Sequence, residues 1–113
     1  MTSNEFKLRW QRDAHKALGE FLATAAEIDL PAVTWTIATS GALSGDVVSL
    51  GSTPVAMRIA FRVWANWLGA DVTERTTKDG VAHLYAKFVW AKKDTVRGAI
   101  RATIYPPLED GGE

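Results

Sequence analysis

The chain has 113 residues, enough for one domain with a single hydrophobic core and too few for two. Thirteen basic and thirteen acidic side chains cancel, which argues against indiscriminate binding of polyanions. The absence of cysteine excludes disulfide bonds and thiolate metal sites. No apolar run approaches the roughly 20 residues that span a bilayer, and no signal-peptide pattern is present. We therefore expect one soluble, cytoplasmic domain over residues 1–107 that has no membrane partner.

Residues 4–28 are expected to form a long amphipathic helix. Apolar side chains recur at spacings of three and four, which places them on one stripe. They are Phe6, Trp10, Ala14, Ala17, Leu18, Phe21, Ala25 and Ile28. Thr2 followed by Glu5 predicts a capping box at the start of this helix. The Leu30-Pro31 step predicts its end, because the residue before proline avoids helical backbone angles.

The stretch from residue 33 to residue 47 predicts a hairpin of two short strands with apolar side chains at alternate positions. A three-residue loop pairs Trp35 with Val47, whereas a two-residue loop pairs Trp35 with Asp46. We favour the first register because both of its side chains lie on the buried face. Gly45 in the returning strand indicates a bulge or close packing.

A second helix has clear boundaries in the sequence. Thr53 is expected to be the N-cap, Pro54 the first helical residue, and Gly69 the residue that follows the last turn. The predicted inner face consists of Ala56, Ile59, Ala60, Val63, Trp64 and Trp67, widened by Met57, Phe61 and Leu68. So wide a stripe predicts burial against a sheet on one side and against the first helix, or a partner, on another.

Three more strands are expected after the second helix. A turn at residues 78–80 pairs the first two of them, and sets Asp71 opposite Lys87 and Arg75 opposite His83. The opposite charges of Asp71 and Lys87 support this register. Glu74 then falls on the inner face, which requires a position at the margin of the sheet.

The last two strands are expected to be joined by a loop from Ala91 to Thr95. This loop sets Tyr85 opposite Arg101 and, two positions away, His83 opposite Thr103. A longer loop would set two like charges against each other and is disfavoured.

The succession of one helix, two strands, one helix and three strands predicts an α+β domain of two layers. We expect an antiparallel sheet of about five strands with both helices on one face and the other face open. The hairpins leave the strand order undetermined, because the first pair can join either edge of the other three. Residues 108–113 are expected to form an acidic flexible tail, either solvated or folded back over the basic face described next.

The strands between residues 75 and 105 have two faces of different composition, because side chains alternate across a strand. One face is apolar and collects Leu84, Phe88, Trp90, Ile100 and Ile104. The other is basic and aromatic, and its candidate partner-binding residues are Arg75, His83, Tyr85, Lys87, Arg97, Arg101 and Tyr105.

The basic and aromatic face predicts a non-catalytic interaction module that docks on a protein partner or on a second copy as a homodimer. The alternative is a small accessory nucleic-acid-binding protein. In that case Lys87, Arg97 and Arg101 would contact phosphates, and Tyr85 or His83 would stack on bases. A merely solvated face, with a cation–π pair between Tyr85 and Arg101, accounts for the same composition.

We expect no catalytic residue, no cofactor and no metal. His15 and His83 have no neighbouring motif of a nucleophile or of a metal site, and a pair between His83 and Asp71 would be coincidental. A small-molecule pocket near Trp35 and Trp64 is a third hypothesis. The surplus tryptophans Trp64, Trp67 and Trp90 are candidates for a self-association surface.

Overall fold

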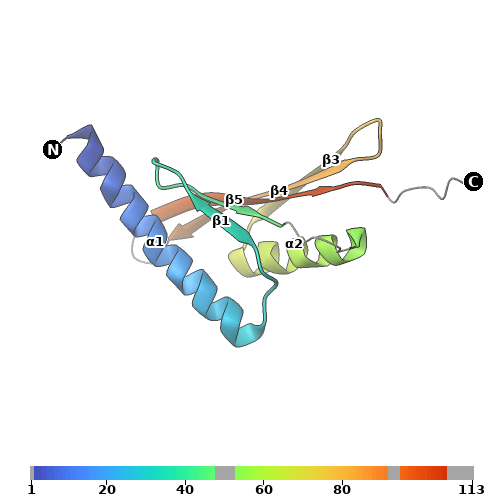
Figure 1. Cartoon of the computed structure of the whole chain (residues 1–113), viewed down its shortest axis with the longest axis horizontal. Helices are drawn as coiled ribbons and strands as arrows, with labels where there is room; N and C mark the ends of the chain where they lie inside the picture. Colours follow the sequence, from blue (N-terminus) through green and yellow to red (C-terminus); the bar gives the residue numbers. More distant parts are fainter. Residues whose placement is uncertain (1, 48–52, 92–94, 107–113) are drawn as a thin grey trace, which may run out of the picture.

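The computed structural model describes residues 2–47, 53–91 and 95–106, and shows an α+β fold with two helices and one five-stranded sheet (Figure 1). In chain order the elements are α1 (Ser3–Ile28), β1 (Thr34–Ile37), β2 (Leu43–Asp46), α2 (Pro54–Leu68), β3 (Asp71–Thr76), β4 (Ala82–Ala91) and β5 (Thr95–Ile104). The acidic tail expected at residues 108–113 lies outside the described residues.

The sheet is mixed, which corrects the expectation of an antiparallel sheet. Its strand order is β1-β2-β5-β4-β3, and β2 runs parallel to β5 whereas the other three pairs are antiparallel. The three antiparallel pairs are hairpins between strands that follow each other in the chain. The parallel pair joins strands that are separated by α2, β3 and β4, so no local turn specifies it. The last described strand, β5, therefore lies at the centre of the sheet.

The registers predicted for β3, β4 and β5 are confirmed. Asp71 lies opposite Lys87 and Arg75 opposite His83 in the first hairpin. In the second hairpin Tyr85 lies opposite Arg101, and the paired strands continue to Ala91 and Thr95, so the loop is shorter than expected.

The register predicted for the hairpin of β1 and β2 is wrong by two residues. Trp35 lies opposite Gly45, and neither Val47 nor Asp46 faces it. Gly45 is buried, and a Cβ atom added to it would lie 2.9 Å from Cζ3 of Trp35. The missing side chain gives the indole ring its space, which is the close packing that a strand glycine indicates.

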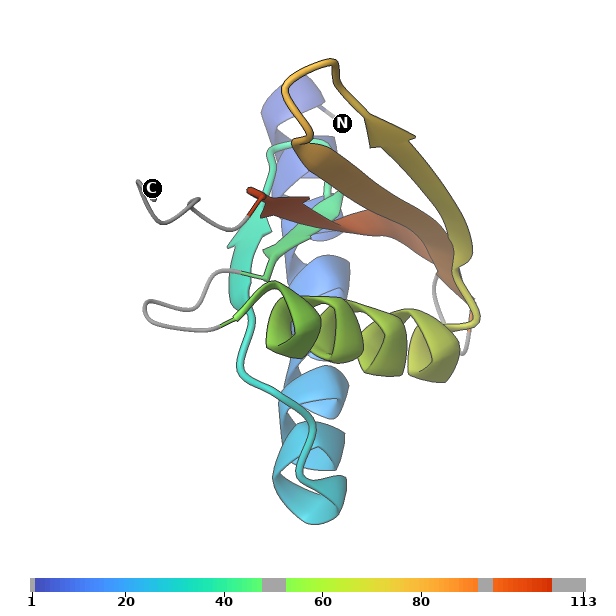
Figure 2. The same cartoon turned by 90° about the vertical axis from the view of Figure 1, so that its right-hand side faces the viewer.

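Both helices lie on one face of the sheet, where α2 crosses β4 and β5 and α1 crosses the end at which β5 begins (Figures 1 and 2). The predicted caps are present. The Thr2 hydroxyl accepts a hydrogen bond from the Glu5 backbone N–H, and the Thr53 hydroxyl accepts one from the Ala56 backbone N–H. Gly69 ends α2 with left-handed backbone angles. The even-numbered side chains of β4 and β5 point into this layer, and the inner face predicted for these strands is confirmed.

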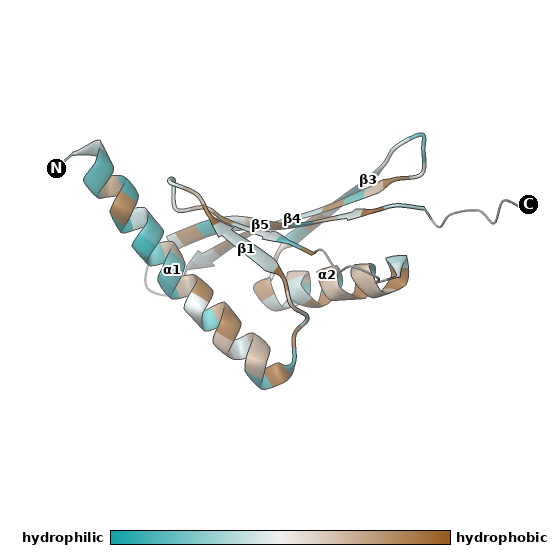
Figure 3. Cartoon of the chain, in the orientation of Figure 1, coloured by the Kyte–Doolittle hydropathy of each residue, from teal (hydrophilic) through white to brown (hydrophobic). Residues whose placement is uncertain are grey.

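The apolar stripe of α1 is longer than the sheet that it covers. Ala14, Ala17 and Phe21 in the middle of the helix are buried, whereas Phe6 and Trp10 are 40% and 45% exposed. These two rings stack on each other at a centroid distance of 6.1 Å. The N-terminal half of α1 projects past the end of the sheet, and it is largely hydrophilic outside these apolar positions (Figure 3). The expected stripe is thus buried only over its middle.

The face that α2 buries is rotated from the predicted one. Its buried residues are Phe61, Trp64, Ala65 and Leu68. Ala56, Ile59 and Val63, which were expected on the inner face, are exposed. Apolar residues cover most of this helix, so the pattern alone left the direction of burial open. The exposed side carries a β-branched row of Val55, Ile59 and Val63 that points away from the sheet.

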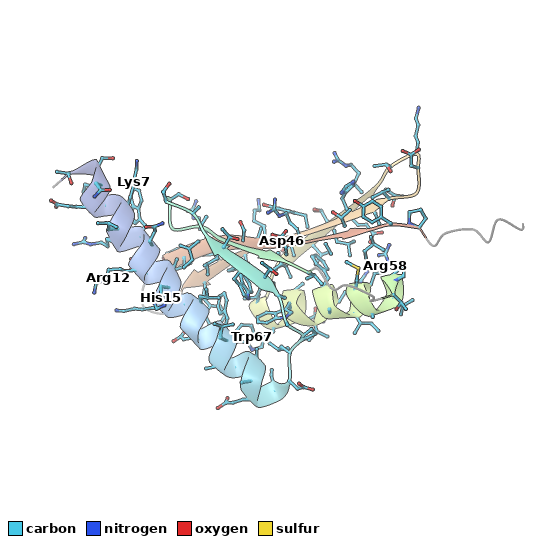
Figure 4. All side chains as sticks on the ribbon, in the orientation of Figure 1. Lys7, Arg12, His15, Asp46, Arg58 and Trp67 are labelled. Atoms are coloured by element: carbon cyan, nitrogen blue, oxygen red, sulfur yellow. The ribbon has the colours of Figure 1, made fainter. Side chains whose placement is uncertain are left out.

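Aromatic rings connect the two helices to the sheet. Phe21 of α1 is fully buried, and its ring contacts Trp35 of β1, Trp67 of α2 and Trp90 of β4 at centroid distances of 4.9–5.5 Å. Figure 4 shows Trp67 on the side of α2 that faces α1. Four of the five tryptophans thus pack into or against the core, and Trp10 is the one with a large exposed fraction.

Candidate interaction surface

The face of the sheet opposite the helices, here called the outer face, is formed by the odd-numbered side chains of β3, β4 and β5 together with Ser44 and Asp46 of β2. No described helix covers it (Figure 1). Arg75, Tyr85, Lys87, Arg97 and Arg101 are exposed here, and His83 is half-buried. Tyr105 follows the end of β5 and is also exposed.

Two hollows divide the outer face, and Tyr85 lines both. The larger, of about 630 Å³, lies between β2, β4 and β5 and brings Tyr85 together with Lys87, Val89 and Arg97. The smaller, of about 400 Å³, lies over β3, β4 and β5. It brings Tyr85 together with Arg75, His83, Thr103 and Arg101. Five of the other six candidate residues thus share a hollow with Tyr85, whereas Tyr105 lines neither hollow.

The outer face carries charges of both signs. Nε of Arg101 lies 3.4 Å from a carboxylate oxygen of Asp46, on the neighbouring strand β2. Lys87 lies directly opposite Asp71 of β3. Arg97 lies opposite Val89, which is 57% exposed. The positive charge of the candidate residues is therefore partly offset by acidic side chains on the same face.

Sequence reasoning missed Asp46, Val89 and Ala99 as parts of this face. Val89 and Ala99 have odd residue numbers, as the candidate residues on the same strands do. The alternation of side chains along a strand therefore could have identified them. Asp46 had no such signal, because its place beside Arg101 depends on the parallel pairing of β2 and β5.

Glu74 points to the inner face of the same sheet. It lies on the edge strand β3, at the margin of the sheet, where an inward-facing glutamate was expected to lie. It accepts two hydrogen bonds from Arg58 of α2, at 3.0 and 3.1 Å. These hydrogen bonds hold the pKa of Glu74 below its usual value and raise the pKa of Arg58. The pair thus joins α2 to the edge strand β3, and the carboxylate is not available to the outer face.

The space in which a small-molecule pocket was expected is occupied by aromatic rings. Trp35 and Trp64 contact each other at a centroid distance of 5.5 Å, and the indole N–H of Trp64 donates to the Pro31 carbonyl at 2.7 Å. The indole nitrogen of Trp35 is buried without an acceptor among the described residues.

The strand register separates His83 from Asp71, the acidic residue with which a pair was considered. His83 is opposite Arg75 and Thr103, and Asp71 lies four positions along β3, or about 13 Å away. His15 is exposed on α1 and projects away from the sheet (Figure 4).

Within the described part of the chain, no group of three His, Asp or Glu side chains is placed to hold a metal ion. The described helices also include none with the length and apolar character to cross a bilayer. Comparison of the chain with protein-family models, with curated proteins and with solved structures gives no match.

Proposed function

We propose that this protein is a non-catalytic interaction module that binds a protein partner on the outer face of its sheet. The observation that carries the proposal is the composition of the larger hollow. Tyr85 and Val89 there provide exposed apolar surface, while Lys87 and Arg97 provide charge beside it. Aromatic side chains and arginine are enriched at protein interfaces.

The charge distribution favours a protein over a nucleic acid as the occupant. Asp46 pairs with Arg101, and Asp71 faces Lys87, so two of the cations already have a carboxylate neighbour. A phosphate backbone would be repelled by these carboxylates, whereas a protein surface can present groups of both signs. The expected partner carries acidic groups for Arg97 and Arg75 and an apolar side chain for the hollow beside Val89.

Site-specific photo-crosslinking tests this proposal. A benzophenone amino acid at position 89 lies beside the larger hollow, and the same group at position 55 lies on the exposed side of α2. In lysate of the native source we expect a discrete adduct from position 89 and none of that mass from position 55. The adduct should disappear when Lys87→Glu and Arg97→Glu are combined with the crosslinker. Equal adducts from both positions, or none from position 89, would contradict the proposal.

Nucleic-acid binding is the second candidate, because Tyr85 shares each hollow with two arginine or lysine side chains. Bases can stack on tyrosine while cations contact the phosphates. This candidate predicts saturable binding of labelled oligonucleotides that weakens steeply with salt. It also predicts that Arg97→Glu combined with Arg101→Glu abolishes binding while the circular dichroism spectrum is retained. Binding that persists in the double variant would exclude this use of the face.

A further inference from the structure

Strand β3 is an edge of the sheet that no other described strand or helix covers. It pairs with β4 on one side only, and all six of its residues are exposed. Val72, Thr73 and Thr76 are β-branched residues that favour extended backbone. An edge of this kind is a template for pairing with another strand unless charges or bulges oppose it.

The backbone groups that are available at this edge follow from the hairpin turn. The Thr77 N–H donates to the Val81 carbonyl at 2.9 Å, which makes these two residues a hydrogen-bonded pair. Hydrogen-bonded and non-hydrogen-bonded pairs alternate along an antiparallel ladder. Thr73 and Arg75 therefore direct their backbone groups toward β4, and Val72, Glu74 and Thr76 direct theirs outward.

We propose that a second copy of this chain pairs with β3 through its own β3, antiparallel, with Thr73 facing Thr73 at the twofold axis. In this register Val72 of each copy exchanges backbone hydrogen bonds with Glu74 of the other. Both residues direct their backbone N–H and C=O groups away from β4, so these groups are available to the second copy. Asp71 of each copy then lies opposite Arg75 of the other, in a non-hydrogen-bonded pair whose side chains approach closely. The contact forms two pairs between Asp71 of one copy and Arg75 of the other, and it sets no like charges opposite each other.

The charges of β3 select this register from its neighbours. An axis at Glu74 would set two glutamates against each other, and an axis at Arg75 would set two arginines against each other. An axis at Asp71 would do the same with two aspartates. An axis at Val72 avoids like charges but moves Arg75 beyond the end of the partner strand, to face the helix-capping Gly69. Among these five axes, only the one at Thr73 pairs the outward backbone groups and also sets Asp71 and Arg75 opposite a residue of the other sign. Like charges directly opposite each other are destabilising.

The charge of Glu74 does not oppose this contact. An inward-facing charge on an edge strand often prevents pairing between sheets. Here Glu74 is held by two hydrogen bonds from Arg58 of its own chain, so its carboxylate is already compensated. Across the axis it faces Val72, which is exposed in the single chain and would be covered by the partner.

A single cysteine tests the position of the axis, because the chain contains none. Thr73→Cys places two thiols opposite each other in a non-hydrogen-bonded pair, within the Cα distance that a disulfide spans. We expect mild oxidation to convert this variant into a covalent dimer. Thr36→Cys on β1, at the opposite edge of the sheet, is the matched control and should remain monomeric on a denaturing gel. Absence of a covalent dimer from Thr73→Cys, or equal yields from both variants, would overturn the proposal.

Charge reversal tests the register. Sedimentation of the otherwise unchanged chain should show a monomer–dimer equilibrium. Asp71→Arg or Arg75→Asp should each weaken the dimer at least tenfold, and the two together should restore it to within about threefold, since the pairs are then re-formed with exchanged signs. Asp79→Arg in the exposed turn is the control and should leave the dimer unchanged.

Other results would overturn the proposal. A strict monomer at all concentrations would do so, as would a dimer that neither single reversal weakens. A dimer that Arg97→Asp abolishes would place the contact on the outer face instead of the edge. The photo-crosslinking at position 89 is independent of these results, so the edge contact and the proposed partner face can fail separately.

Discussion

At the scale of single residues, two glycines on the inner face of the sheet make room for aromatic rings. Gly45 lies opposite Trp35, and Gly98 lies opposite Phe88 on the neighbouring pair of strands. A Cβ atom at Gly98 would lie 2.5 Å from Cζ of Phe88 and 2.5 Å from the Leu43 carbonyl oxygen. The first neighbour is a buried ring and the second is backbone, so neither can move away cheaply.

Gly98→Ala should therefore lower the free energy of unfolding by about 1–3 kcal/mol, the usual cost of overfilling a packed core. Gly19→Ala is the matched control. An added Cβ at Gly19, within α1, meets no atom within 4 Å. It should stabilise the protein by about 0.5–1 kcal/mol through helix propensity. Urea unfolding of both variants measures the two effects, and equal changes of the same sign would contradict this account.

At the scale of secondary-structure elements, the pair of Arg58 and Glu74 links α2 to β3 through polar contacts. Hydrogen bonds from Arg58 lower the pKa of Glu74 in the folded protein relative to its usual value. A carboxyl group of lowered pKa stabilises the fold above its unfolded pKa and loses that contribution as the pH falls through the folded value. Both side chains are about one-third exposed, so solvent weakens the pair.

Glu74→Gln should consequently flatten the acid limb of the stability curve. The original chain should lose stability as the pH falls below about 4.3, the ordinary value for glutamate, and the variant should lose less over the same range. Urea titrations between pH 7 and pH 3 give this comparison. Glu27→Gln, on the exposed end of α1, is the control and should keep the slope of the original chain. A slope that is the same in Glu74→Gln as in the original chain would show that the pair does not act in solution.

At the scale of the whole molecule, the aromatic cluster makes one cooperative unit of the two layers. Phe21 contacts rings from β1, α2 and β4, so neither helix can leave without opening the same cluster. A chain of this size with one core normally unfolds in a single transition.

The tryptophan fluorescence and far-ultraviolet circular dichroism transitions should therefore coincide in urea. Trp10 lies outside the cluster, so Trp10→Phe removes its emission and leaves four tryptophans that report on the core. The transitions should still coincide in that variant. Separate midpoints would show that α1 or the hairpin of β1 and β2 unfolds independently.

The parts of the fold that the sequence predicted are those that local rules determine. Caps at Thr2, Thr53 and Gly69 follow from side-chain chemistry, and the registers of β3, β4 and β5 follow from short loops and charge pairs. The pairing of β2 with β5 joins residues more than 50 positions apart, and no turn motif or charge pair in the sequence predicts it. Asp46 was missed on the outer face for the same reason.

Two further errors arose where hydrophobicity was ambiguous. Ile59 and Val63 are as apolar as the residues that α2 buries, so only the position of the sheet decides which side is inside. In the first hairpin, the slip of two residues kept the correct side chains inside, because alternation has a period of two. Gly45 is the partner of Trp35 because the indole ring needs the space that a side chain would fill. This requirement concerns shape, and a pattern of polar and apolar residues does not contain it.

The position of β5 bears on how the protein is made. Synthesis proceeds from the N-terminus, and β5 leaves the ribosome after the other four described strands, yet it is the strand that joins β2 to β4. Until residues 95–104 have emerged, the hairpin of β1 and β2 has no partner strand and the hairpin of β3 and β4 exposes a second edge. Nascent chains that stall before this point present two unpaired strands together with the rings of Phe88 and Trp90, a combination that favours aggregation. Completion of the sheet therefore depends on the emergence of β5, and neither hairpin has its full set of neighbouring strands before that point.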